Sequence, residues 1–190
     1  VSTVLAKNGE ALAGANYSMG SMSGIHNAHP DWKIIATETA SPSNSRGIYN
    51  TLSQYNKKGD YQCTAYDTNA VSWGNTARES WWYTIKDDFV SGEFIWTGFD
   101  YLGEPTPYSV YPVGVSSFGT IDTAGFAKDS FYLYQSQWTS TPMVHLLPTN
   151  WDQWHDGEEV EVWVNTNQPS AELFLNGESL GKKSLRQEIL

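Results

Sequence analysis

The chain is poor in the residues on which several classes of protein depend. Among its 190 residues there is one cysteine, Cys63, so no disulfide can form within the chain. Its 11 lysines and arginines form no run and are outnumbered by 21 acidic residues, which gives a net charge of −10. This balance argues against a nucleic-acid partner or an anionic membrane surface. No apolar run approaches the roughly 18 residues of a transmembrane helix, so we expect no membrane span.

Sequence motifs for cofactors and metals are also missing. The chain contains no Gly-rich phosphate loop and no dinucleotide-binding fingerprint. His26 and His29 form a His-x-x-His pair in a segment with Gly24 and Pro30, but no third ligand lies nearby in the sequence. We therefore expect no metal site and no cofactor.

Aromatic side chains, by contrast, are abundant. The chain has nine tryptophans and eleven tyrosines. Aromatic rings supply core area, and they are also the usual platforms on which neutral ligands such as sugars stack. The composition is therefore compatible with a carbohydrate ligand.

The most informative side chain is Glu38, which ends a short apolar stretch, Lys33 to Thr37. The adjacent Ile34 and Ile35 predict a strand buried on both faces, as in a parallel sheet covered by helices. A charge at the tip of such a strand is costly to desolvate unless it has a function or a partner. In barrel enzymes, active sites lie at the carboxyl ends of the strands. Two interpretations stay open on this segment alone: a catalytic carboxylate, or a strand-end residue that caps a loop or pairs with Arg46.

The order of predicted elements changes near residue 140. Before it, apolar strand-like runs alternate with helical segments, which is the signature of parallel βα units. The predicted strands are residues 11–17, 33–37 and 93–97, and the predicted helices are residues 47–56, 76–86 and 128–138. Asn75 or Thr76 can serve as the N-cap of the second helix. Gly and Pro cluster between residues 103 and 119, which predicts a long loop after the third strand.

After Pro142 the hydrophobic period changes to two. Valines alternate with other residues from Val160 to Val164, apolar residues alternate again from Ala171 to Leu175, and Asn176-Gly177 is the favoured two-residue hairpin turn. This pattern predicts antiparallel sandwich strands. An immunoglobulin-like sandwich needs about 100 residues, and three strands cannot close an eight-stranded barrel of about 250 residues. We therefore expect a fragment that is cut at both ends.

Four segments in series resemble glycoside hydrolase family 2, most closely its β-galactosidase-like members. Residues 37–41 (Thr-Glu-Thr-Ala-Ser) and 45–49 (Ser-Arg-Gly-Ile-Tyr) resemble the region of the catalytic nucleophile. Residues 94–108, which begin Phe-Ile-Trp-Thr-Gly-Phe-Asp, resemble the segment after the last barrel strand. Residues 117–132 resemble the stretch that leads into the last barrel helix, and the Asn176-Gly177 hairpin is similar to the sandwich domain that follows the barrel.

The resemblance implies a fold and an activity. Residues 1–140 would be the C-terminal part of a (β/α)8 TIM barrel, and residues 141–190 the start of an immunoglobulin-like β-sandwich. The parent would be a retaining exo-β-glycosidase that hydrolyses terminal β-D-galactosides through a covalent glycosyl-enzyme on Glu38. Such enzymes also need an acid/base carboxyl group, which the family takes from an Asn-Glu pair after the fourth strand. No such pair precedes Glu38 here, so we expect this chain alone to be inactive.

The resemblance also implies which residues form the site. Glu38 matches the nucleophile at the end of the seventh strand. Tyr17 belongs to a motif after the sixth strand whose hydroxyl lies close to the nucleophile, and Trp96 matches an aromatic residue that lines the sugar subsite. Without the resemblance, Tyr17 and Trp96 can equally be read as barrel-lining or core aromatics. The residues expected to contact the substrate, an oligosaccharide or β-galactoside, are Asn16, Tyr17, His26, Trp96, Asp100 and Glu104.

Two alternatives remain open at this point. Within the enzyme class the parent could be a β-glucuronidase, but a uronic acid needs a cationic partner for its carboxylate. The loop of residues 98–108 offers only acidic charge, which favours a neutral sugar. Outside the enzyme class, the chain could be a non-catalytic carbohydrate-binding or interaction module. An Asn-Glu pair on an upstream strand of the parent chain would distinguish an enzyme from such a module.

Overall fold

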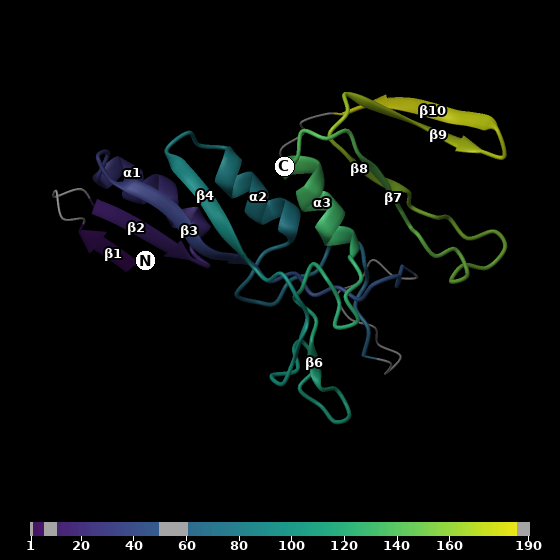
Figure 1. Cartoon of the computed structure of the whole chain (residues 1–190), viewed down its shortest axis with the longest axis horizontal. Helices are drawn as coiled ribbons and strands as arrows, with labels where there is room; N and C mark the ends of the chain where they lie inside the picture. The colour runs from purple at the N-terminus through teal and green to yellow at the C-terminus, as the bar shows by residue number, and fades with distance from the viewer. Residues whose placement is uncertain (1, 6–10, 50–60, 186–190) are drawn as a thin grey trace.

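Three parallel strands and one antiparallel edge strand form the first sheet of the molecule (Figure 1). The computed structural model describes residues 2–5, 11–49 and 61–185. In spatial order the strands are β1 (Ser2–Leu5), β2 (Ala11–Asn16), β3 (Lys33–Ala40) and β4 (Val90–Trp96). β2, β3 and β4 run parallel, whereas β1 runs antiparallel to β2. The three predicted strands are confirmed, and β1 is one that the sequence pattern does not predict.

Two of the helices lie between the parallel strands in the sequence and pack on one face of the sheet. The 3₁₀ turn η1 (Met19–Ser21) and α1 (Met22–Ala28) join β2 to β3, α2 (Ala77–Ile85) precedes β4, and α3 (Asp129–Trp138) follows it. The core beneath α1 consists of small and apolar residues: Ala13, Ala15, Met19, Met22, Ile34 and Ala36. None of the helices in the described ranges is long and apolar enough to cross a bilayer.

The two faces of the sheet differ in burial. Ile34 is fully buried under the helices, whereas its neighbour Ile35 is only half-buried. On other strands of the sheet, Leu12 is 41% and Phe94 64% exposed. The prediction of a strand buried on both faces is therefore wrong for the described part of this chain, because helices cover only one face. An uncovered apolar face on a parallel sheet is unusual, since such sheets are normally covered on both sides.

The start of α2 shows how the sequence fixes a helix boundary. The Thr76 hydroxyl accepts a hydrogen bond from the Glu79 N–H at 3.2 Å, which confirms the predicted N-cap. The buried Asp67 carboxylate accepts two more, from the N–H groups of Ala77 at 2.9 Å and Arg78 at 2.8 Å. Burial raises the pKa of Asp67, and these hydrogen bonds oppose that shift. Three otherwise unpaired donors at the helix N-terminus are satisfied in this way.

The loop predicted after the third strand contains a small antiparallel ribbon. β5 (Tyr101–Leu102) pairs with β6 (Val115–Ser116), and the ribbon projects from the end of the sheet (Figure 1). Gly119 follows the ribbon and packs directly against the backbone near Asp100. The ribbon therefore begins and ends next to the carboxyl end of β4.

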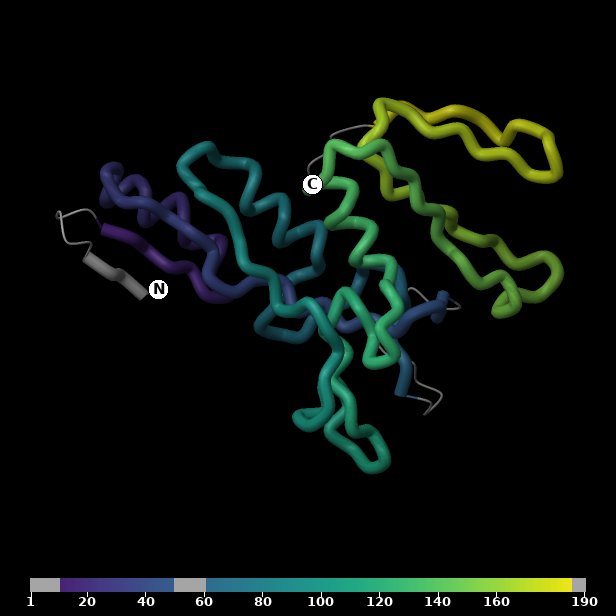
Figure 2. The backbone as a smooth tube through the Cα atoms, viewed as in Figure 1, coloured from purple at the N-terminus to yellow at the C-terminus, as the bar shows by residue number. Residues whose placement is uncertain are grey.

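The C-terminal part of the chain consists of two antiparallel pairs (Figure 2). β7 (Val144–Leu147) pairs with β8 (Trp163–Thr166), and β9 (Ser170–Leu175) pairs with β10 (Glu178–Ser184). The turn between β9 and β10 is Asn176-Gly177, with φ angles of 52° and 85°. Two successive positive φ angles are what a type I′ hairpin turn requires, so the hairpin prediction is confirmed. These paired strands are consistent with part of a sandwich.

Two predicted boundaries differ from the structure. The strand expected to begin at Val160 begins only at Trp163, because the preceding residues form no ladder with β7. Residues 47–49 of the helix predicted at 47–56 are not helical, and residues 50–60 lie outside the described ranges. Here Gly47 has a φ of 75°, which is incompatible with an α-helix.

Side-chain hydrogen bonds tie the two parts of the chain together at α3. The Asp129 carboxylate accepts from the Tyr49 hydroxyl at 2.5 Å and lies 2.6 Å from His145 Nε2 on β7. The Tyr66 hydroxyl donates to the Glu161 carbonyl at 2.5 Å. Burial is the main cause that raises the pKa of Tyr66 to about 12. The contacts on α3 therefore come from both sides of residue 140.

We expect Gly119→Ala to lower the free energy of unfolding by about 2 kcal/mol or more, because overpacking costs about 1–3 kcal/mol. A Cβ at this position would lie 2.1 Å from the Asp100 nitrogen and 2.2 Å from the Phe99 carbonyl carbon. Neither backbone atom can move without shifting the end of β4. Gly98→Ala is the matched control, since a Cβ there meets no atom within 4 Å. Equal melting temperatures for the two variants in thermal unfolding would contradict this packing argument.

Candidate active site

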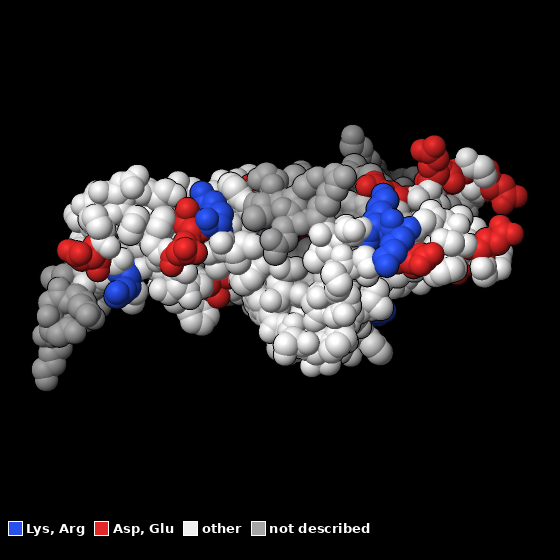
Figure 3. All heavy atoms as spheres, turned by 90° about the horizontal axis from the view of Figure 1, so that it is seen from above, with Lys and Arg blue, Asp and Glu red and all other residues white. Residues whose placement is uncertain are grey.

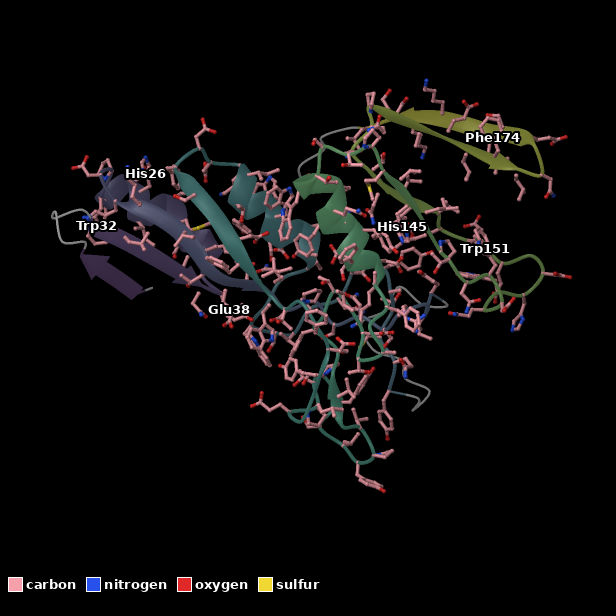
Figure 4. All side chains as sticks on the ribbon, viewed as in Figure 1. His26, Trp32, Glu38, His145, Trp151 and Phe174 are labelled. Carbon is pink, nitrogen blue, oxygen red and sulfur yellow. The ribbon has the colours of Figure 1, made fainter. Side chains whose placement is uncertain are left out.

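The carboxyl ends of the three parallel strands bring the principal predicted residues together. Asn16 ends β2 and is paired in register with Glu38 on β3, and Trp96 ends β4. Because the strands are parallel, their carboxyl ends lie at the same end of the sheet. Figure 4 shows Glu38 at that end.

Glu38 is held by its neighbours on β2. Its Oε2 accepts a hydrogen bond from Asn16 Nδ2 at 3.2 Å, and its backbone carbonyl accepts from the Tyr17 N–H at 2.9 Å. Arg46 does not pair with it. That guanidinium donates to Asp122 at 2.6 Å and lies over the Phe126 ring. The alternative in which Glu38 pairs with Arg46 is therefore wrong.

Tyr17 is fixed at its hydroxyl. The hydroxyl oxygen lies 2.6 Å from Ser41 Oγ, and the two groups share a hydrogen bond. Burial raises the pKa of Tyr17; the Ser41 hydrogen bond opposes this shift, and the charge of Glu38 and the Tyr101 ring add to it. The backbone here is unusual, because Tyr17, Ala40 and Ser41 all have positive φ angles, of 45°, 64° and 67°. Such conformations are strained for residues with a side chain and concentrate at functional sites.

A pocket of about 450 Å³ opens beside Glu38. Five aromatic residues line it, and its charged groups are both carboxylates, Glu38 and Glu104. Its lining residues are Tyr17, Glu38, Ser41, Trp73, Trp96, Tyr101, Glu104, Pro105, Thr106, Ser109 and Phe118. No lysine or arginine of the described ranges lines it. On the face seen in Figure 3 the basic side chains are scattered rather than gathered in one patch.

Trp73 is a lining residue that sequence reasoning missed. It is 57% exposed and lies in the segment between β3 and α2. Gly74 allows this segment to reach the pocket, because a Cβ there would be 2.3 Å from the Ala40 carbonyl oxygen. The Asn75 N–H then donates to the same oxygen at 2.8 Å. No hydrophobic period marks this segment, so only the Gly-Asn pair after the tryptophan hinted at a turn there.

Asp100 lies outside this pocket. Its Oδ1 binds Lys128 Nζ at 2.7 Å and accepts from the Gly119 N–H at 2.8 Å. The Lys128 ammonium also donates to the carbonyls of Asn44 at 2.8 Å and Ser117 at 3.2 Å. Burial raises the pKa of Asp100 and lowers that of Lys128, while their mutual attraction opposes both shifts. The structure gives Asp100 a buried cation as its partner instead of the expected substrate contact.

His26 also lies away from the pocket. It belongs to α1, which returns the chain toward the amino end of the sheet, and its ring stacks on Phe89 at 4.1 Å. Phe89 directly precedes β4, whereas the pocket is at the other end of the strands (Figure 4). His29 stacks separately on Trp32 at 3.8 Å. Within the described ranges there is no group of three or more His, Cys, Asp or Glu side chains that could hold a metal ion.

The chain is similar to known glycosidases over most of its length. It is 41% identical over 184 residues to the β-galactosidase BoGH2A of Bacteroides ovatus, covering 90% of this chain and 21% of that protein. It is 26% identical over 160 residues to a β-glucuronidase of Bacteroides fragilis, covering 83% of this chain and 22% of that protein. This chain belongs to glycoside hydrolase family 2.

Structural similarity gives the same assignment. The family 2 segment superimposes on the crystal structure of a β-glycosidase from Bacteroides vulgatus with a TM-score of 0.77 and 32% identity, covering 93% of this chain and 26% of that one. Residues 157–189 match a family described as a domain of unknown function, DUF4982. The chain thus spans about a fifth to a quarter of the length of these relatives.

We expect Trp96→Ala to weaken sugar binding more than it destabilises the protein. The ring faces the pocket, and loss of a fully packed tryptophan would instead cost about 3–5 kcal/mol of stability. Michaelis constants and melting temperatures of the full-length protein would be measured together. Trp151→Ala is the control, since Trp151 is 52% exposed and does not line the pocket. A large fall in melting temperature with an unchanged Michaelis constant would show that Trp96 serves the core.

Proposed function

We propose that the parent protein is a retaining exo-β-galactosidase and that Glu38 is its nucleophile. In this proposal residues 1–140 are the last part of a (β/α)8 barrel, and residues 141–190 begin the sandwich that follows it. The observation that carries the proposal is the place of the Glu38 carboxylate. It lies at the carboxyl end of the middle parallel strand and lines a pocket faced by aromatic rings. Active sites of barrel enzymes lie at that end of the strands.

The chemistry follows from the contacts of Glu38. A nucleophilic carboxylate must be ionised, and the Asn16 amide donates a hydrogen bond to Oε2, which favours the charged form. One carboxylate oxygen forms a bond to the anomeric carbon while the glycosidic C–O bond breaks. The leaving oxygen takes its proton from an acid/base carboxyl group outside this chain. Water then attacks the glycosyl-enzyme, and the sugar leaves with its anomeric configuration retained.

The remaining lining residues suit a neutral hexose. Trp96 and Phe118 offer apolar ring surface to the sugar C–H groups, and the Glu104 carboxylate can accept a hydrogen bond from a sugar hydroxyl. In a glucuronide the substrate carboxylate would meet two acidic side chains and, from the described residues, no cation to pair with. This charge balance supports a galactoside over a glucuronide. A panel of nitrophenyl β-glycosides with the full-length protein tests the choice directly.

The 190-residue chain by itself should be inactive, because the proposed proton donor lies elsewhere. Its uncovered sheet face, with Leu12 and Phe94 exposed, also supports an incomplete barrel. Turnover by the purified chain, free of contaminating enzyme, would contradict both the partial barrel and the location of the acid/base.

In the full-length protein, Glu38→Gln should preserve the fold and reduce kcat to below about 1% of wild type, because the amide cannot form the glycosyl-enzyme. A 2-fluoro-galactosyl inactivator, followed by peptide mass spectrometry, should label the wild-type protein on Glu38. Azide should restore turnover to Glu38→Ala and give the inverted glycosyl azide.

Glu104→Gln is the matched control, since it removes the other carboxylate of the same pocket. This variant should still be labelled on Glu38. A label on any other carboxylate, or Glu38→Gln activity above a few per cent, would exclude Glu38 as the nucleophile.

A further inference from the structure

The Ser41 side chain occupies a position at which the ends of all three parallel strands meet. Its Oγ hydrogen-bonds with the Tyr17 hydroxyl after β2, at 2.6 Å. Its backbone N–H donates to the carbonyl of Trp96 at the end of β4, at 3.1 Å. Ser41 itself follows β3 by one residue, three positions after Glu38. One small residue therefore touches the two aromatic residues proposed to serve the sugar site.

Burial of Ser41 decides the direction of its hydrogen bond. The residue is 1% exposed, and among the described residues Tyr17 is the only hydrogen-bond partner of its hydroxyl. A buried hydroxyl whose proton has no hydrogen-bond acceptor destabilises the folded protein. Ser41 therefore donates to the Tyr17 oxygen. Tyr17 lines the pocket, so its own proton is left free to point toward the substrate space.

The groups around Tyr17 fit this orientation. Burial raises the pKa of the Tyr17 phenol and the negative charge of Glu38 adds to this shift, so Tyr17 keeps its proton. Tyr101 contributes in the same direction, and Glu104 is the other acidic group of the pocket. The hydrogen bond from Ser41 lowers the pKa and makes the phenol a better donor. A hydroxyl held in this way can donate a hydrogen bond to the Glu38 carboxylate or to the sugar bound beside it.

The backbone at Ser41 has a further implication. Its φ angle of 67° lies in the left-handed region, which glycine adopts readily and in which a residue with a side chain is strained. A Cβ added to Gly74 would lie only 3.1 Å from the Ser41 Cβ, so the side chain at position 41 has little space. Serine is therefore a poor choice for the backbone at this position. Its hydroxyl is the feature that glycine could not supply.

We propose that Ser41 is a positioning residue of the glycosidase reaction, which acts by holding the Tyr17 hydroxyl with its proton directed into the pocket. This inference rests on the proposed function. It assigns the strained backbone after β3 a role in orienting a hydrogen-bond donor, the Tyr17 hydroxyl, separate from the attack by Glu38.

The test uses the full-length protein and a nitrophenyl β-galactoside. Ser41→Gly should leave the melting temperature unchanged or higher, because it relieves the strained φ, yet lower kcat about tenfold or more, as expected when a group at the reacting centre is misplaced. KM should change less than about twofold. Ala40→Gly is the matched control: it relieves a φ of 64° on the neighbouring residue without removing a hydroxyl, and it should keep wild-type kcat.

A double-mutant cycle separates positioning from a general structural role. If Ser41 acts through Tyr17, then Ser41→Gly should have no further effect on kcat in the Tyr17→Phe background. Ser41→Ala, which keeps the Cβ, repeats the measurement should the glycine variant fold poorly. Wild-type kcat in both Ser41 variants, or equal losses in the two backgrounds, would overturn the inference alone. A wild-type protein without β-glycosidase activity would overturn the proposed function together with it.

Discussion

The Lys128 ammonium is the contact on which the shape of the pocket depends. Its side chain is 1% exposed, and it binds oxygens from three separate segments, those of Asn44, Asp100 and Ser117. Withdrawing a charge from water costs several kcal/mol unless such partners compensate for it. These segments follow β3, follow β4 and precede α3, so they cannot move apart without leaving a buried charge unpaired. The walls that carry Ser41 and Phe118 are fixed by the same constraint.

Much of the fold could be predicted, because its signals are local. The strand that carries Glu38, the N-cap at Thr76 and the Asn176-Gly177 turn each depend on neighbouring residues, and the structure contains all three. The failures concern contacts between distant segments. The pairing of β1 with β2 has no signature in the hydrophobic period of the sequence. The burial of a sheet face depends on the elements that cover it, and the adjacent Ile34 and Ile35 do not reveal those elements.

The candidate site divides in the same way. The resemblance to family 2 predicted that Glu38, Tyr17 and Trp96 lie together, and the parallel strands bring them to one pocket by aligning their carboxyl ends. Asp100 could not be assigned correctly, since its partner Lys128 is 28 residues away and no pattern joins them. Trp73 was missed because close backbone approach at Gly74 brings it to the pocket. The residues placed by strand register were predictable, whereas those placed by loop packing were not.

The hydrogen bonds on α3 also limit how freely family members could exchange their parts. Asp129 is buried between Tyr49, from the first part of the chain, and His145, from the second. A chimaera joined at residue 140 would give α3 a foreign β7, and Asp129 would keep its hydrogen bond from Tyr49 but lose that from His145 unless the donor sequence supplied a match. Segments on both sides of residue 140 therefore share this contact surface, and a recombination point that preserves it has to lie before Tyr49 or beyond the β7–β8 pair.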